Sequence, residues 1–133
     1  MEEKGHYKGK NFTMDWDPDN KIIYIVVSGY HKKEDAEEFT AKFRDFLNDF
    51  SSTPFKILVN GLELSKSDHE ARRIYTKYVK GNFEHDLAGA VALCSKNLFI
   101  RMVGKFVVAV APTTRLRIFD KVEDGFSWLK SSK

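Results

Sequence analysis

Few residues in this chain have the types and spacing that catalysis requires. The single cysteine, Cys94, follows an apolar run and could act as a nucleophile, but no neighbouring histidine supports that role. A small buried thiol is the simpler interpretation. The chain also lacks the G-x-S-x-G, H-E-x-x-H and G-x-x-x-x-G-K-[ST] motifs of hydrolases, zinc proteases and phosphate-binding loops. We therefore predict that the protein is not an enzyme.

Side chains that could bind a metal ion occur in two pairs, His69 with Glu70 and His85 with Asp86. Their spacing matches no known metal site, and roles in loops and helix caps explain them better. We predict no metal and no cofactor.

A polar loop made of Ser65, Ser67, Asp68 and His69 is a candidate regulatory site. Ser67 and Glu70 have the spacing of a capping box, which predicts a helix that begins at Ser67. A phosphate on Ser65 or Ser67 would meet free amides and the positive end of the helix dipole. The alternative is that Ser67 is the N-cap and Ser65 an ordinary loop residue.

The predicted helix after this loop is basic. Arg73, Lys77 and Lys80 recur at i, i+4 and i+7, and Arg72 lies beside them. This face could contact an anionic headgroup or an acidic partner. A solvated face is the alternative.

The stretch 98–110, LFIRMVGKFVVAV, predicts a helix that is apolar around most of its circumference. We expect Leu98, Met102 and Phe106 to face the sheet. The adjoining strip, which we predict to be an apolar binding surface, comprises Phe99, Val103, Val107 and Val110. Its partner could be a neighbouring helix, a second protomer in a homodimer or an apolar ligand.

The elements that position these residues alternate along the chain. Period-two and continuous apolar runs predict strands near 12–17, 21–28, 55–65, 87–93 and 115–119. Helical spacing predicts helices over about 32–49, 67–80, 98–110 and from Asp120 onward. The order β-β-α-β-α-β-α-β-α predicts a single α/β domain with a mainly parallel sheet and a leading hairpin.

Composition limits the class of protein. The 133 residues suit one domain, which we place at 11–133 after a flexible tail at 1–10. The net charge of +3, with cations scattered among 19 acids, argues against specific nucleic-acid binding. No signal-like or membrane-spanning run is present, and one cysteine cannot form an internal disulfide. We predict a cytoplasmic protein with at most peripheral membrane contact.

Four segments carry a resemblance to a known family. They are FTMDWDPDNKIIYIVVSG, FKILVNGLEL, ARRIYTKY and IFDKVEDGFSWL, and the similarity extends from Phe12 to Leu129. The chain resembles the SpoIIAA-like family, which is described as STAS/SEC14-like. In the related anti-sigma-factor antagonists a serine after an aspartate is phosphorylated at the start of this helix. Here that aspartate falls on Asp68 and the serine position on His69.

The resemblance implies a STAS-like fold and a role in binding, and its SEC14-like side implies a nonpolar small molecule or lipid. Our first hypothesis is therefore a non-enzymatic binding module for a protein partner or a nonpolar ligand. The alternative is a phosphoregulated antagonist that acts through the loop at 65–69.

Overall fold

The computed structural model describes residues 5–50, 55–82, 90–110 and 115–131. Their elements are, in chain order, β1 (His6–Lys8), β2 (Phe12–Asp17), β3 (Ile22–His31), α1 (Lys33–Phe50), β4 (Lys56–Ser67), α2 (His69–Asn82), β5 (Ala90–Cys94), α3 (Leu98–Val110), β6 (Arg115–Phe119) and α4 (Val122–Ser131). The predicted order is confirmed, with β1 added before it. Within these ranges no helix is both long enough and apolar enough to cross a membrane.

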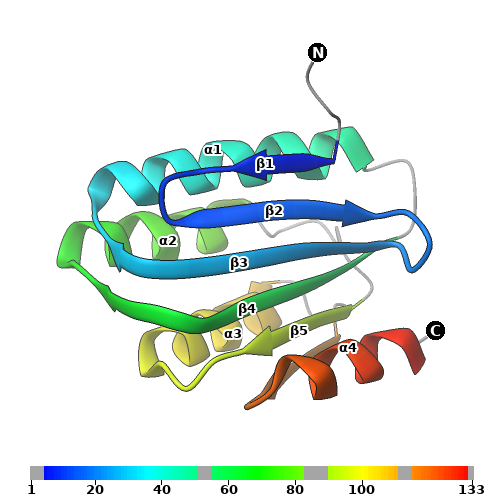
Figure 1. The fold of residues 1–133 in the computed structure, drawn as a ribbon. Helices are drawn as coiled ribbons and strands as arrows, with labels where there is room; N and C mark the ends of the chain where they lie inside the picture. Colours follow the sequence, from blue (N-terminus) through cyan, green and yellow to red (C-terminus); the bar gives the residue numbers. More distant parts are fainter. Residues whose placement is uncertain (1–4, 51–54, 83–89, 111–114, 132–133) are drawn as a thin grey trace.

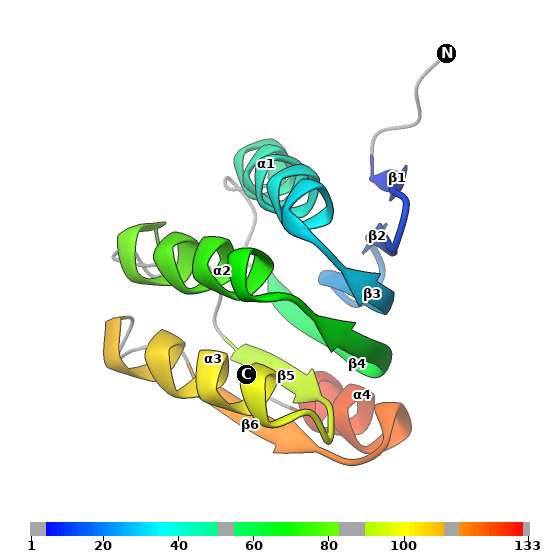
Figure 2. The ribbon, with the colours of Figure 1, turned by 90° about the vertical axis from the view of Figure 1, so that its left-hand side faces the viewer.

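The six strands form one sheet in the order β1-β2-β3-β4-β5-β6. Figure 1 shows β1 to β5 face-on, and β6 is labelled beside β5 in Figure 2. Strands β1, β2 and β3 pair antiparallel, whereas β3, β4, β5 and β6 pair parallel. A helix follows each of β3, β4 and β5, as parallel neighbours require. The expected parallel sheet with a leading hairpin is therefore confirmed.

Strand β1 lies inside the stretch that we predicted to be a flexible tail. Its Tyr7 pairs with Met14 of β2, and the Tyr7 hydroxyl donates to a Glu38 carboxylate oxygen of α1 at 2.5 Å. The Lys42 ammonium also lies 4.8 Å from the centre of the Tyr7 ring. These contacts hold residues 6–8 against α1, so the prediction of a tail is wrong for them.

The helices cover the two faces of the sheet unequally. Figure 2 shows α1, α2 and α3 on one face and α4 on the other. Strand β5 is buried on both faces: Val91 and Leu93 face the three helices, whereas Ala90, Ala92 and Cys94 face α4. The small residues on the second side let α4 lie close to the sheet, and the larger ones fill the wider layer beneath the three helices.

Helix α2 starts later than the sequence predicts. Ser67 is the last residue of β4, pairs with His31 of β3 and is buried. The N-cap is Asp68, whose carboxylate accepts a hydrogen bond from the amide of Ala71 at 2.8 Å. The predicted capping box of Ser67 and Glu70 is therefore wrong, because the strand continues through Ser67 and leaves the next residue to cap the helix.

Candidate functional site

A cavity of about 140 Å³ lies between the sheet and the three helices on its larger layer. The floor comes from β3, β4, β5 and β6, and the roof from α1, α2 and α3. Representative floor residues are Ile25, Ile57 and Leu93, and representative roof residues are Phe43, Val79 and Val103. The walls present apolar atoms to the space, so water inside would find no hydrogen-bonding partner.

Four residues that line the cavity carry polar side-chain atoms: His31, Thr40, Tyr75 and Tyr78. The Thr40 hydroxyl donates to the Ala36 carbonyl oxygen of α1 at 2.9 Å. The His31 Nε2 atom lies 3.0 Å from the carbonyl oxygen of Asn11, and its Nδ1 atom lies 2.6 Å from the Tyr75 hydroxyl. Because a carbonyl can only accept, Nε2 carries the proton in the neutral ring, and Nδ1 accepts from Tyr75. His31 and Tyr75 contribute carbon atoms to the cavity wall, while these hydrogen bonds occupy their polar atoms.

The tyrosines near the cavity are held in their neutral form. Burial raises the pKa of Tyr75 well above its usual value, and the negative charge of Asp35 adds to that effect. Burial also raises the pKa of Tyr78 to about 12. Both tyrosine side chains are therefore uncharged at neutral pH.

Helix α3 presents a different face to the sheet from the one that we predicted. Leu98 is 83% exposed and Met102 is 44% exposed, so the expectation that they face the sheet is wrong. The side chain of Phe106 lies outside the described residues. The sheet-facing positions are instead Ile100, Gly104 and Val107.

The predicted apolar strip of α3 faces inward, toward the cavity. Phe99, Val103 and Val107 all line it, and the Phe99 ring centre lies 6.4 Å from that of Tyr75. Val107 is buried in the core, so it offers no outer surface. The side chain of Val110 lies outside the described residues. Burial thus places three strip residues together around an internal space, a position that the sequence did not reveal.

The predicted regulatory loop is divided between a strand and a helix. Ser65 is exposed in β4, whereas Ser67 is buried at the end of that strand. Asp68 caps α2, and His69 is its first residue and is exposed. All four border an open depression of about 560 Å³ at the N-terminal ends of α2 and α3.

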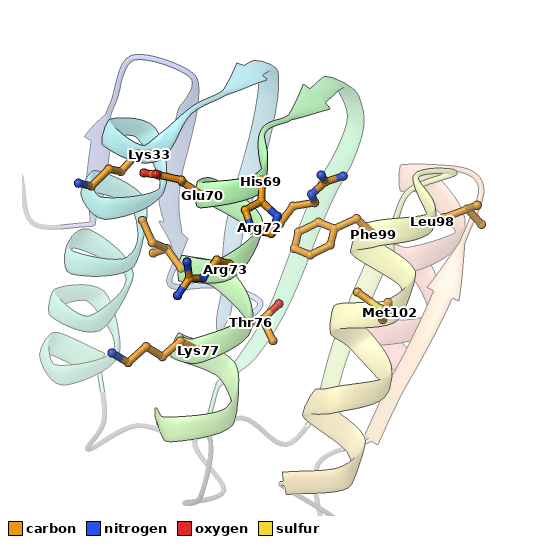
Figure 3. Close-up of a pocket in the computed structure, with 11 residues that line it drawn as sticks. Lys33, His69, Glu70, Arg72, Arg73, Thr76, Lys77, Leu98, Phe99 and Met102 are labelled. Atoms are coloured by element: carbon orange, nitrogen blue, oxygen red, sulfur yellow. The ribbon is translucent and has the colours of Figure 1, made fainter.

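The predicted cationic face lies on the outer side of α2. Figure 3 shows Arg72, Arg73 and Lys77 along this helix, with Leu98 and Met102 across from them on α3. All five side chains are exposed and border a second open depression, of about 1180 Å³.

The remaining candidates for chemistry are not brought together. Cys94 is fully buried on the α4 side of the sheet, and burial, with Glu123 and Asp124 nearby, raises its thiol pKa to about 11. Such a thiol is a poor nucleophile at neutral pH. Among the described residues no three His, Cys, Asp or Glu side chains form a metal-binding group, and His85 and Asp86 lie outside them.

Comparison with known proteins identifies the fold. No family model and no curated protein matches the sequence. Among solved structures, the chain is similar to an uncharacterised protein of the DUF3478 family from Shewanella loihica PV-4, which has a SpoIIAA-like fold. The TM-score is 0.65 at 17% sequence identity, over 97% of this chain and 98% of the other. This protein therefore has a SpoIIAA-like fold, as the resemblance found in its sequence implied.

Proposed function

We propose that this protein is a non-enzymatic binding module that holds a nonpolar small molecule in the cavity beneath α1, α2 and α3. The observation that carries the proposal is the apolar lining of a space of about 140 Å³. Apolar cavities of roughly 150 Å³ remain dry and accept ligands the size of benzene. The size favours a single small ring or a short branched chain over a complete lipid.

The chemistry of the surroundings supports binding without catalysis. A reaction would need a nucleophile or an acid–base group that can reach the ligand. The polar side-chain atoms of His31, Thr40 and Tyr75 are hydrogen-bonded within the protein, and Cys94 lies on the opposite side of the sheet. Transfer of a nonpolar ligand from water into this apolar space is favourable without any polar contact.

Toluene is a suitable probe, and one substitution can fill the space that it would occupy. Val79 of α2 is buried and lines the cavity, so Val79→Phe should project a ring into it. Val108 of α3 is 46% exposed and does not border the cavity, so Val108→Phe is the matched control. Circular dichroism would first establish that both variants fold.

The expected result is a toluene-dependent rise in melting temperature for the wild type and for Val108→Phe, but not for Val79→Phe. At tenfold excess over its Kd, a ligand stabilises the native state by about 1.4 kcal/mol. For a domain of this size that corresponds to a rise of about 4–7 °C. Equal rises in all three proteins, or none in the wild type, would contradict the proposal.

A phosphoregulated antagonist is the second candidate, and exposure of Ser65 beside the start of α2 is the observation that favours it. Against it, Ser67 is buried in β4 and His69 occupies the position where the resemblance places the modified serine. A cytoplasmic location and a homodimer remain predictions from the sequence.

A further inference from the structure

The outer surface of α2 forms a broad depression that is separate in position from the cavity. It is bordered by the start of α1 on one side and by the first turns of α3 on the other (Figure 3). Its volume is about 1180 Å³, and it is open to solvent. Small-molecule sites usually bury most of the ligand's surface, so a depression that is this large and open to solvent fits a macromolecular partner better.

The border of the depression is strongly cationic. Lys33 of α1 and three residues of α2, Arg72, Arg73 and Lys77, contribute positive charge, against the single carboxylate of Glu70. None of the four cations forms an ion pair with another described residue; the pairs found there join His6 to Asp15 and Arg101 to Asp120. Their charge is therefore available to an anionic partner.

Apolar side chains lie directly beside these cations. Leu98 and Met102 are one helical turn apart on α3 and are 83% and 44% exposed. Both border the same depression. Large apolar side chains that are exposed together beside polar residues are typical of interaction sites.

We propose that this surface docks an acidic amphipathic helix from another protein. A helix laid along α2 would place carboxylates against Arg73 and Lys77, which are four residues apart, and leucine-type side chains against Leu98 and Met102. The concave shape favours a helix over a flat bilayer, which would touch the rim of a depression more than its floor. This proposal does not depend on the nonpolar ligand.

The probe is a fluorescein-labelled synthetic helical peptide with leucines at i, i+3, i+4 and i+7 and glutamates on the flanking positions. Fluorescence anisotropy would measure its Kd for the wild type and for a triple variant, Arg72→Glu with Arg73→Glu and Lys77→Glu. The matched control reverses three exposed cations elsewhere, Lys8→Glu, Lys10→Glu and Lys121→Glu, so the net charge is the same. Phe99 stays unchanged, because it borders both the depression and the cavity.

We expect the α2 triple variant to weaken binding by about tenfold or more and the control triple by less than about twofold. A peptide with lysines in place of glutamates should instead prefer the α2 triple variant. Leu98→Ser with Met102→Ser should weaken binding of the acidic peptide by about fivefold or more.

Three results would overturn the proposal. The first is failure of the acidic peptide to bind the folded wild type. The second is equal binding of a scrambled peptide whose leucines do not share one face. The third is binding to vesicles of phosphatidylserine and phosphatidylcholine through the α2 cations when the peptide does not bind, because that would assign the surface to a membrane.

Discussion

The contact between α4 and β5 gives a sharp test of how closely the two layers pack. Gly125 of α4 is buried, and a methyl group at this position would lie 2.9 Å from the Cys94 sulfur. It would also lie 3.3 Å from the Ala92 Cβ atom and 3.4 Å from a ring carbon of Phe119. The first distance is shorter than any normal contact, so Gly125→Ala requires the helix or the sulfur to move.

Two opposing effects determine the magnitude. In an exposed helix interior, replacing glycine by alanine stabilises by roughly 1 kcal/mol. Overpacking a well-packed core costs about 1–3 kcal/mol. We therefore expect Gly125→Ala to lower the free energy of unfolding by about 1 kcal/mol. If Cys94 is first changed to alanine, the closest contact disappears, and the same Gly125→Ala change should cost about 1 kcal/mol less.

Urea denaturation followed by circular dichroism would measure all four members of this double-mutant cycle. Ser127→Ala is the control for helix propensity, because Ser127 is an exposed residue of the same helix. If Gly125→Ala stabilised the protein by about as much as propensity alone predicts, α4 would not approach β5 as closely as described. A coupling energy near zero would refute the specific contact with the Cys94 sulfur.

Two further predictions concern the cap of α2 and the buried thiol. Asp68→Ala should lower the free energy of unfolding by about 1 kcal/mol in thermal or urea denaturation, and a larger loss for Ser67→Ala would restore the capping box inferred from the sequence. Because the pKa of Cys94 is raised to about 11, its thiol is neutral at pH 7, and maleimide should label the native protein far more slowly than the urea-unfolded protein. Equal labelling rates at pH 7 would mean that the thiol is neither buried nor perturbed.

The types of most elements could be predicted because their residue periodicity is strong. The alternation of apolar and polar residues in 12–17 favours a strand, and the spacing of phenylalanines in 33–50 favours a helix. The structure contains both elements. The continuous apolar run of β5 also predicted a strand, but no local pattern indicates that α4 covers its second face.

The cap of α2 was harder to predict because two neighbouring residues fit it. Ser67 and Asp68 are both good N-cap residues, and Ser67 also has Glu70 at the capping-box spacing. Pairing of Ser67 with His31 decides between them, and that pairing joins strands far apart in the sequence. The hydrogen bond between His31 and Tyr75 also joins residues far apart in the sequence, so local sequence patterns do not predict it.

The orientation of α3 shows why the cavity escaped sequence analysis. A helix that is apolar around most of its circumference has only a narrow polar face, here Arg101 and Lys105, so its sequence pattern fixes its rotation poorly. Its orientation instead follows from Gly104, where a methyl group would lie 3.0 Å from a Leu93 methyl carbon and 3.3 Å from one of Leu116. The missing side chain lets α3 approach β5 and β6 at this residue.

Once Gly104 faces the sheet, helical geometry places the other side chains of α3. Ile100 and Val107, at i−4 and i+3, must also face the sheet, and both are buried. Phe99 and Val103 then turn toward α2, where they border the cavity, and Met102 turns outward beside the cations of α2. The position of Gly104 in α3 therefore determines both which side chains of this helix line the cavity and which are exposed beside the cations of α2.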